Sequence, residues 1–150
     1  MRRLSEIRTP TDALLVAQLS VLAAVIPLLM RLPLKRVQDL LEPSGDLRDP
    51  GGARAHHALA LVSLVLDFGR PAFRPTCLTR GITRYYALRR AGVDVALAFG
   101  IGQPTGGQVG GHCWLVKDGE PFLETQDPRA WFTEMYRISG ESTGVVALAC

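Results

Sequence analysis

The order of the predicted elements indicates an α+β fold, in which helices come first and a helix then leads into a small antiparallel sheet. Three observations support this prediction. Apolar residues recur with helical spacing through the first half of the chain, residues 93–102 alternate as a strand does, and an Asp-Gly pair at 118–119 separates two strand-like runs. A chain of 150 residues is long enough for one domain, 1–150, with its own hydrophobic core.

Three helices are expected before residue 70. The first covers the apolar segment 13–30, with Thr11 or Asp12 as its N-cap. Because that segment is apolar on nearly every side, we expect other parts of the protein to cover it. The run "LKRVQDLLE" predicts a second, amphipathic helix, and "HHALALVSLVLDFG" predicts a third that ends near Gly69. Residues 43–53 are rich in Pro, Gly and Asp and predict a loop.

A fourth helix and a sheet are expected in the second half. "PTCLTRGITRYYALRRAG" predicts a helix with Thr76 as its N-cap, which places Cys77 in the first turn. "VDVALAFGIG", residues 93–102, predicts a strand. After a glycine-rich connection, "GGHCWLVKDGEPFLE", residues 110–124, predicts a hairpin that turns at its Asp-Gly pair. The final residues 143–150 predict a last short strand.

The composition excludes several classes of protein. It is 47% hydrophobic and 21% charged, which is typical of a globular protein and argues against disorder. The net charge of +3 is too small and too dispersed to predict nucleic-acid binding. Cys77, Cys113 and Cys150 cannot all pair within one chain and lack zinc-finger spacing. These cysteines predict a reducing compartment, the cytoplasm, and no metal.

The apolar segment 13–30 leaves the relation to membranes open. It contains Gln18, Ser20 and Pro27, lies at the short limit for spanning a bilayer, and has no convincing cleavage site after it. A buried or surface-docked helix is therefore favoured over a membrane anchor and over a cleaved signal peptide.

Cys77 and His112 are the candidates for chemistry. A helix N-terminus favours a thiolate, and Cys77 is expected there. A buried, inert cysteine is the commoner alternative, so a base must be found before Cys77 is treated as a nucleophile. His112 begins a predicted strand and is expected to share a face with Trp114, while Cys113 should point to the opposite face and pack. A helix-borne cysteine with a strand-borne histidine is an arrangement used for cysteine nucleophiles.

A carboxylate should orient the imidazole, and the turn geometry selects between candidates. A type I turn with Gly119 in a left-handed bulge sets His112 opposite Glu124, and we favour this register. A two-residue turn would instead set Thr125 opposite His112 and direct Glu124 to the other face. Asp127 is the alternative acid if the second strand ends early.

These residues resemble a known family, the transglutaminase-like cysteine proteases of lasso peptide biosynthesis, which are the stand-alone B2 leader peptidases. The resemblance covers about residues 70–130. It is carried by Cys77-Leu78, by "YYALRRAGVDVALAFGI" at 85–101, by His112 and Trp114, by Asp118-Gly119, and by Glu124.

The resemblance implies a transglutaminase-like, papain-like core over residues 71–135, with the catalytic helix packed on a small antiparallel sheet, after a mainly helical part, 1–70. It implies that Cys77 is the nucleophile, His112 the general base and acid, and Glu124 the orienting carboxylate. The chain departs from the family at Cys113, where a small residue is usual. The family's third acid is often Asp, which keeps Asp127 as the alternative.

The implied activity is removal of the leader from a ribosomally made precursor peptide, without a cofactor. A separate leader-recognition protein would present the precursor, and an asparagine-synthetase-like cyclase would use the freed amino terminus. Three alternatives stay open: a transglutaminase-like acyl transferase or amidase, a non-catalytic peptide-binding module on the same fold, and a membrane-associated protein anchored by residues 13–30.

Overall fold

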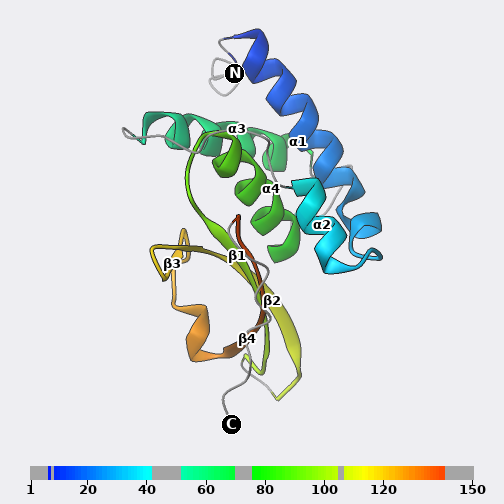
Figure 1. Cartoon of the computed structure of the whole chain (residues 1–150), viewed down its shortest axis with the longest axis vertical. Coiled ribbons are helices and arrows are strands. Elements are labelled where there is room, and N and C mark those ends of the chain that lie inside the picture. The colour runs from blue at the N-terminus through cyan, green and yellow to red at the C-terminus, as the bar shows by residue number, and fades with distance from the viewer. Residues whose placement is uncertain (1–6, 8, 42–51, 70–75, 105–106, 141–150) are drawn as a thin grey trace. The chain divides into compact units, whose positions relative to one another are not determined.

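A computed structural model describes residues 7, 9–41, 52–69, 76–104 and 107–140 of the chain. Its backbone forms two compact units, residues 1–93 and 94–150, and the boundary between them follows the fourth helix. The first unit is helical and the second contains an antiparallel sheet (Figure 1), which confirms the predicted α+β class.

The four expected helices are present in the helical unit. The second begins where it was predicted, the third begins three residues before its predicted start, and Gly69 ends the third as expected. The predicted loop over 43–53 falls almost wholly outside the described residues, and the predicted strand over 143–150 does so entirely. The helices are α1 (Pro10–Leu29), α2 (Leu34–Leu41), α3 (Ala53–Phe68) and α4 (Cys77–Arg90).

The prediction that Thr11 or Asp12 caps α1 is wrong, because the helix starts earlier. Thr9 is the N-cap and Pro10 is the first helical residue, a position that suits the fixed φ of proline. The Thr9 hydroxyl accepts a hydrogen bond from the backbone amide of Asp12 at 3.2 Å. The Asp12 carboxylate accepts one from the amide of Thr9 at 2.9 Å, which completes a capping box.

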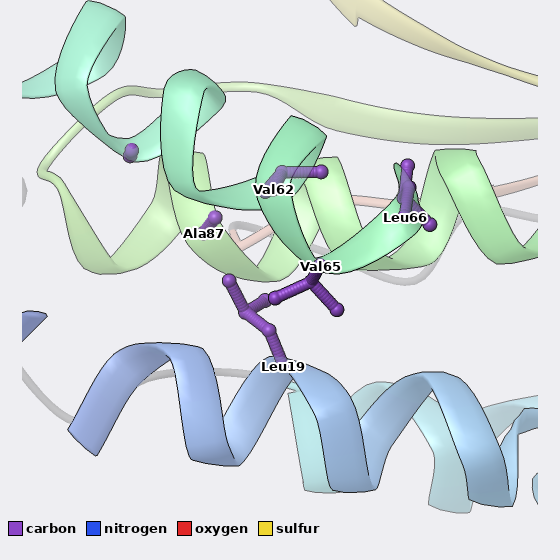
Figure 2. Packing of buried hydrophobic residues seen from close by; sticks show 6 residues of the cluster. Leu19, Val62, Val65, Leu66 and Ala87 are labelled. Carbon is purple, nitrogen blue, oxygen red and sulfur yellow. The ribbon is translucent and has the colours of Figure 1, made fainter. Parts of the chain in front are cut away.

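The expectation that α1 is covered on all sides is also wrong. Leu19, Ala23 and Ile26 are buried, and their spacing of four and three residues defines one stripe along the helix. Figure 2 shows that Leu19 points toward Val65 of α3. The face opposite this stripe is apolar but exposed to solvent. We call it the outer face of α1, and it consists of Leu14, Ala17, Val21, Ala24 and Leu28.

A small core holds α1, α3 and α4 together. Its members come from all three helices and are almost completely buried: Leu19, Ala58, Val62, Val65, Leu66 and Ala87 (Figure 2). Each large aliphatic side chain buried in this way contributes about 1.5–3 kcal/mol of hydrophobic free energy. The core therefore fixes α4, the helix whose first turn carries Cys77.

The sheet has four strands in the order β3-β2-β1-β4, and all neighbours are antiparallel. The last strand, β4, was not predicted. It is an edge strand in which Glu134 is less exposed than Met135. Buried and exposed positions along it therefore do not correspond to apolar and polar residues. The strands are β1 (Ala96–Gly102), β2 (Gly110–Lys117), β3 (Glu120–Phe122) and β4 (Phe132–Ile138).

The hairpin between β2 and β3 uses the register that we did not favour. Its turn contains two residues, Asp118 with φ of 52° and Gly119 with φ of 83°, so that Lys117 pairs with Glu120. Turns with two positive φ angles match the twist of the strands they join, and an Asp-Gly pair suits them. The predicted bulged register, with His112 opposite Glu124 in the ladder, is therefore wrong.

One face of β1 carries only small side chains: Ala96, Ala98, Gly100 and Gly102. The Trp114 ring and the backbone at the start of β4 lie very close to the two glycines. A Cβ atom at Gly100 would lie 2.8 Å from the Trp114 ring and 2.8 Å from the Thr133 carbonyl oxygen. At Gly102 it would lie 1.8 Å from the carbonyl oxygen of Trp131. The backbone at the start of β4 can reach β1 only because these side chains are absent.

We expect Gly102→Ala to lower the free energy of unfolding by about 3 kcal/mol and Gly100→Ala by about 1–3 kcal/mol, because both overpack a close contact with backbone. Gly110→Ala is the matched control, since its Cβ would meet no atom nearer than 3.9 Å. The control should be neutral or slightly stabilising. Urea unfolding of the three variants measures these differences, and equal stability of all three would contradict the close contacts.

Candidate active site

Cys77 is the first residue of α4, as predicted. The Thr76 hydroxyl caps the helix by accepting a hydrogen bond from the backbone amide of Thr79 at 3.2 Å. The first turn of α4 contains no acidic residue, and Arg89 and Arg90 lie in its last turn. Because no acidic side chain in the first turn offsets it, the positive end of the helix dipole can stabilise the thiolate form of Cys77. Cys77 is half-buried and is not in a disulfide.

His112 lies on β2 between two aromatic rings. Its ring stacks on Trp114, with centroids 6.0 Å apart and an interplanar angle of 19°, and faces Phe132 at 5.1 Å. The shared face with Trp114 agrees with the strand alternation that we predicted. Cys113 points to the other face and is buried. The two rings restrict the rotamers of the imidazole, so its edges point in fixed directions.

Glu124 reaches His112 although the hairpin register differs from the favoured one. β3 ends at Phe122, and the next residue, Leu123, has a φ of 63°. A left-handed residue breaks the alternation of the strand and redirects the chain that follows it. As a result, Glu124 Oε2 lies 3.7 Å from His112 Nε2, and both side chains are only about a quarter exposed, at 24% and 25%.

Asp127 has a structural role in the described contacts. It caps the short 3₁₀-helix η2 (Pro128–Ala130) by accepting a hydrogen bond from the Arg129 amide at 2.9 Å. The Arg129 guanidinium also donates to both Asp127 oxygens, and it reaches Glu120 Oε2 at 2.6 Å. The side-chain hydrogen bonds from Arg129 lower the pKa of Asp127 below its ordinary value. Asp127 thus remains the alternative acid, but its carboxylate is already engaged.

A cavity of about 420 Å³ opens beside His112 and Glu124, and we call it the His112 cavity. Its walls are the apolar side chains of Pro104, Pro128, Trp131 and Phe132. Thr125 and Gln126 add neutral polar groups to the lining. The proximity of Trp131 and Phe132 to His112 depends on the path of the chain from β3 to β4, which the sequence does not show.

The structure brings His112 and Glu124 together within the sheet unit, whereas Cys77 lies in the helical unit. The meeting of the thiol with the imidazole stays a prediction. Among the residues whose placement is described, no three His, Cys, Asp or Glu side chains gather closely enough to bind a metal ion. His57 Nε2 lies at hydrogen-bond distance from Asp12 Oδ1, at 2.8 Å, and this contact links α3 to the start of α1.

Comparison with known proteins gives one result. A family model described as the transglutaminase-like superfamily matches residues 13–137, a span that includes Cys77, His112 and Glu124 as well as most of α1. No curated protein and no solved structure gives a significant match.

The lowered pKa of Asp127 gives a prediction for stability against pH. Because its folded-state pKa lies below the ordinary value of 3.8, the charged carboxylate stabilises the fold above that pH, and this contribution is lost as the pH falls further. Asp127→Asn keeps a capping oxygen but removes the charge. The difference in Tm between the native chain and Asp127→Asn should be constant above about pH 5 and shrink toward about pH 2. A difference that grows at low pH would contradict this assignment.

Proposed function

Since the chain belongs to the transglutaminase-like superfamily, which includes cysteine peptidases and acyltransferases, we propose that it is a cysteine peptidase. Its substrate is a ribosomally made, lasso-type precursor peptide, from which it removes the leader. Cys77 is the nucleophile, His112 the general base and acid, and Glu124 the orienting carboxylate. The observation that supports this proposal best is the placement of Glu124 Oε2 at 3.7 Å from Nε2 of His112 on β2.

The position of Glu124 supports one tautomer of His112 in the proposed mechanism. A carboxylate beside Nε2 favours the tautomer with its proton on Nε2, which leaves a lone pair on Nδ1. Nδ1 is then the atom that accepts the thiol proton. The separation of 3.7 Å is longer than a hydrogen bond, and such contacts commonly shorten when substrate binds. Glu124 also stabilises the imidazolium that forms.

In the proposed reaction, Cys77 transfers its proton to Nδ1, and the thiolate attacks the carbonyl carbon at the junction of leader and core. The tetrahedral intermediate collapses when the imidazolium gives its proton to the leaving amine, which frees the core peptide. A water molecule then attacks the thioester after losing a proton to His112, and the leader leaves with a new carboxylate. The imidazolium returns its proton to the Cys77 thiolate, so the enzyme is regenerated without a cofactor.

The remaining parts of the proposal follow the resemblance. A separate leader-recognition protein presents the precursor, an asparagine-synthetase-like cyclase uses the amino terminus that is freed, and the reaction takes place in the cytoplasm. The precursor peptide, the leader-recognition protein and the cyclase are thus the three partners that the proposal names.

Cys77→Ala and His112→Ala should each abolish leader removal while the circular dichroism spectrum is unchanged, because each removes a group that takes part in bond making. Cys113→Ala is the matched control, since that thiol lies on the opposite face of β2 from His112, and it should retain activity. Mass spectrometry of the precursor after incubation gives the readout. Cleavage retained in Cys77→Ala or His112→Ala would rule out the peptidase mechanism, and transfer of the leader to an added amine would favour an acyl transferase.

Glu124→Ala should reduce kcat by about 10- to 100-fold, because the residue orients the base and forms no bond to substrate. Asp127→Ala should reduce kcat less, since Asp127 caps η2 and binds Arg129. Both values come from steady-state cleavage of saturating precursor. If Asp127→Ala has the larger effect, the third member of the site is Asp127.

Iodoacetamide at neutral pH separates the peptidase from a non-catalytic binding module. Cys77 should be alkylated faster than Cys113 and Cys150, because the helix N-terminus favours its thiolate. Peptide mapping over time measures the three rates. Equal rates for Cys77 and Cys113 would support the binding module.

A further inference from the structure

We propose that the His112 cavity binds an uncharged, apolar side chain of the substrate peptide, close to the bond that is cleaved, and that Trp131 determines this specificity. The inference rests on the proposed peptidase function. Ligand sites in proteins commonly have volumes of about 300–1,000 Å³, with mostly apolar walls and a few polar groups. The cavity of about 420 Å³ with four apolar walls falls within this class.

Among the residues that line the cavity, Trp131 gives the clearest indication of a binding site. The chain has two tryptophans, and they differ sharply in exposure: Trp114 is 1% exposed, whereas Trp131 is 44% exposed. Trp114 belongs to the small core of the sheet unit together with Ala98 and Val116. Trp131 instead presents a large apolar surface to solvent beside the candidate base. Exposed aromatic side chains in a concave site are common anchors for recognition.

The wall is held in place before a ligand arrives. The backbone of Trp131 packs directly on Gly102 of β1, where no side chain could be accommodated. On the preceding turn, Arg129 links η2 to Glu120 at the start of β3. Phe132 follows as the first residue of β4 and packs on the His112 ring. A wall fixed at both ends loses little conformational freedom when a side chain binds against it.

The charge in the cavity selects against acidic ligands. His112 and Glu124 are the ionisable residues among its described lining, and they face each other. Among the lining residues that the structure describes, no lysine or arginine would pair with a carboxylate. An anionic side chain would therefore lose its hydration and meet the Glu124 charge, at an unfavourable cost. An uncharged, apolar side chain avoids this charge repulsion and can pack against the four apolar walls.

The test uses the ¹⁵N-labelled full chain as the Cys77→Ala variant, with N-acetyl-leucinamide and N-acetyl-phenylalaninamide as apolar probes. N-acetyl-argininamide and the amide of N-acetyl-aspartic acid serve as charged probes. The apolar probes should shift the indole signal of Trp131 saturably, at about millimolar concentrations, and the acidic probe should not. Trp131→Phe identifies the indole signal and should preserve binding.

The matched variants are Trp131→Ala, which removes the wall, and Met135→Ala, which truncates an exposed side chain of β4 outside the cavity. Binding is followed through the backbone amides of Thr125 and Gln126. Trp131→Ala should weaken apolar binding about tenfold, and Met135→Ala should leave it unchanged. Tighter binding of the arginine probe, or apolar binding that Trp131→Ala does not weaken, would overturn the inference.

The two proposals fail in different ways. If the apolar probes bind at Trp131 but the precursor is never cleaved, the peptidase function fails and the binding pocket stands. If the precursor is cleaved at the same rate by Trp131→Ala and by the native chain, the pocket inference fails alone.

A second, independent observation concerns the outer face of α1, and we infer that it docks on an anionic membrane surface. By length and composition α1 is apolar enough to cross a bilayer, yet Leu19, Ala23 and Ile26 are buried in the helical unit. Crossing would expose that packed stripe, whereas lying in the interface leaves it intact. Leu14, Val21 and Leu28 on the outer face are each more than half exposed. Such a face binds at the boundary of headgroups and acyl chains.

Charge favours an anionic surface over a second copy of the chain. Arg31, Lys35 and Arg36 directly follow α1, and all three are exposed. Residues 1–93 contain fourteen basic and seven acidic residues, whereas residues 94–150 contain three basic and seven acidic ones. The expectation of a dispersed charge is therefore wrong, because the helical unit carries the positive charge. Basic residues beside an apolar face attract anionic lipid headgroups, whereas two such faces repel each other.

Vesicle flotation tests this surface with the full chain. Vesicles of phosphatidylcholine with phosphatidylglycerol should bind the protein, and phosphatidylcholine alone should bind it less. Val21→Glu should abolish binding, and Lys35→Glu should weaken it about fivefold or more. Phe68→Glu is the control, because Phe68 is an equally exposed apolar residue at the end of α3. Equal binding of Val21→Glu, or a dimer in sedimentation that Val21→Glu dissociates, would overturn the membrane assignment.

Discussion

The close approach of backbone to Gly100 and Gly102 is the constraint on which the sheet unit depends. Gly100 also pairs with His112 in the β1–β2 ladder. Because no side chain projects there, the Trp114 ring can lie over Gly100, and the chain can return at Trp131 to start β4. The aromatic rings around His112 and the wall of the His112 cavity follow from the same two positions.

The helical unit positions Cys77 in a different way, by the burial of apolar side chains and by the cap of α4. The core of α1, α3 and α4 fixes the axis of α4, and the Thr76 cap fixes where that helix begins. Cys77 therefore lies at the positive end of the helix dipole, in a first turn that contains no acidic residue. The family match covers residues 13–137, so it spans both units and includes the positions of Cys77 and His112.

Local signals made much of this predictable from the sequence. Thr76 as a cap, the helical periodicity and the alternation of β1 depend on neighbours in the chain, and these predictions were confirmed. The cap of α1 lies at Thr9, before the predicted Thr11 or Asp12, because Pro10 takes the first helical position. Long-range features could not be found in this way. Neither the crossing from β3 to β4 nor the exposed face of α1 depends on residues that lie near each other in the sequence.

The backbone angle of Leu123 affects both the stability of the protein and the orientation of Glu124. A left-handed leucine costs about 1–3 kcal/mol, and glycine at the same position would avoid that cost. Yet the leucine's restricted backbone is what keeps the following carboxylate aimed at the imidazole. Laboratory evolution for heat resistance alone would thus favour glycine at position 123. That substitution would make the backbone before Glu124 more flexible. Selection for turnover would keep the strained residue, which makes position 123 a marker of which pressure has acted on a sequence.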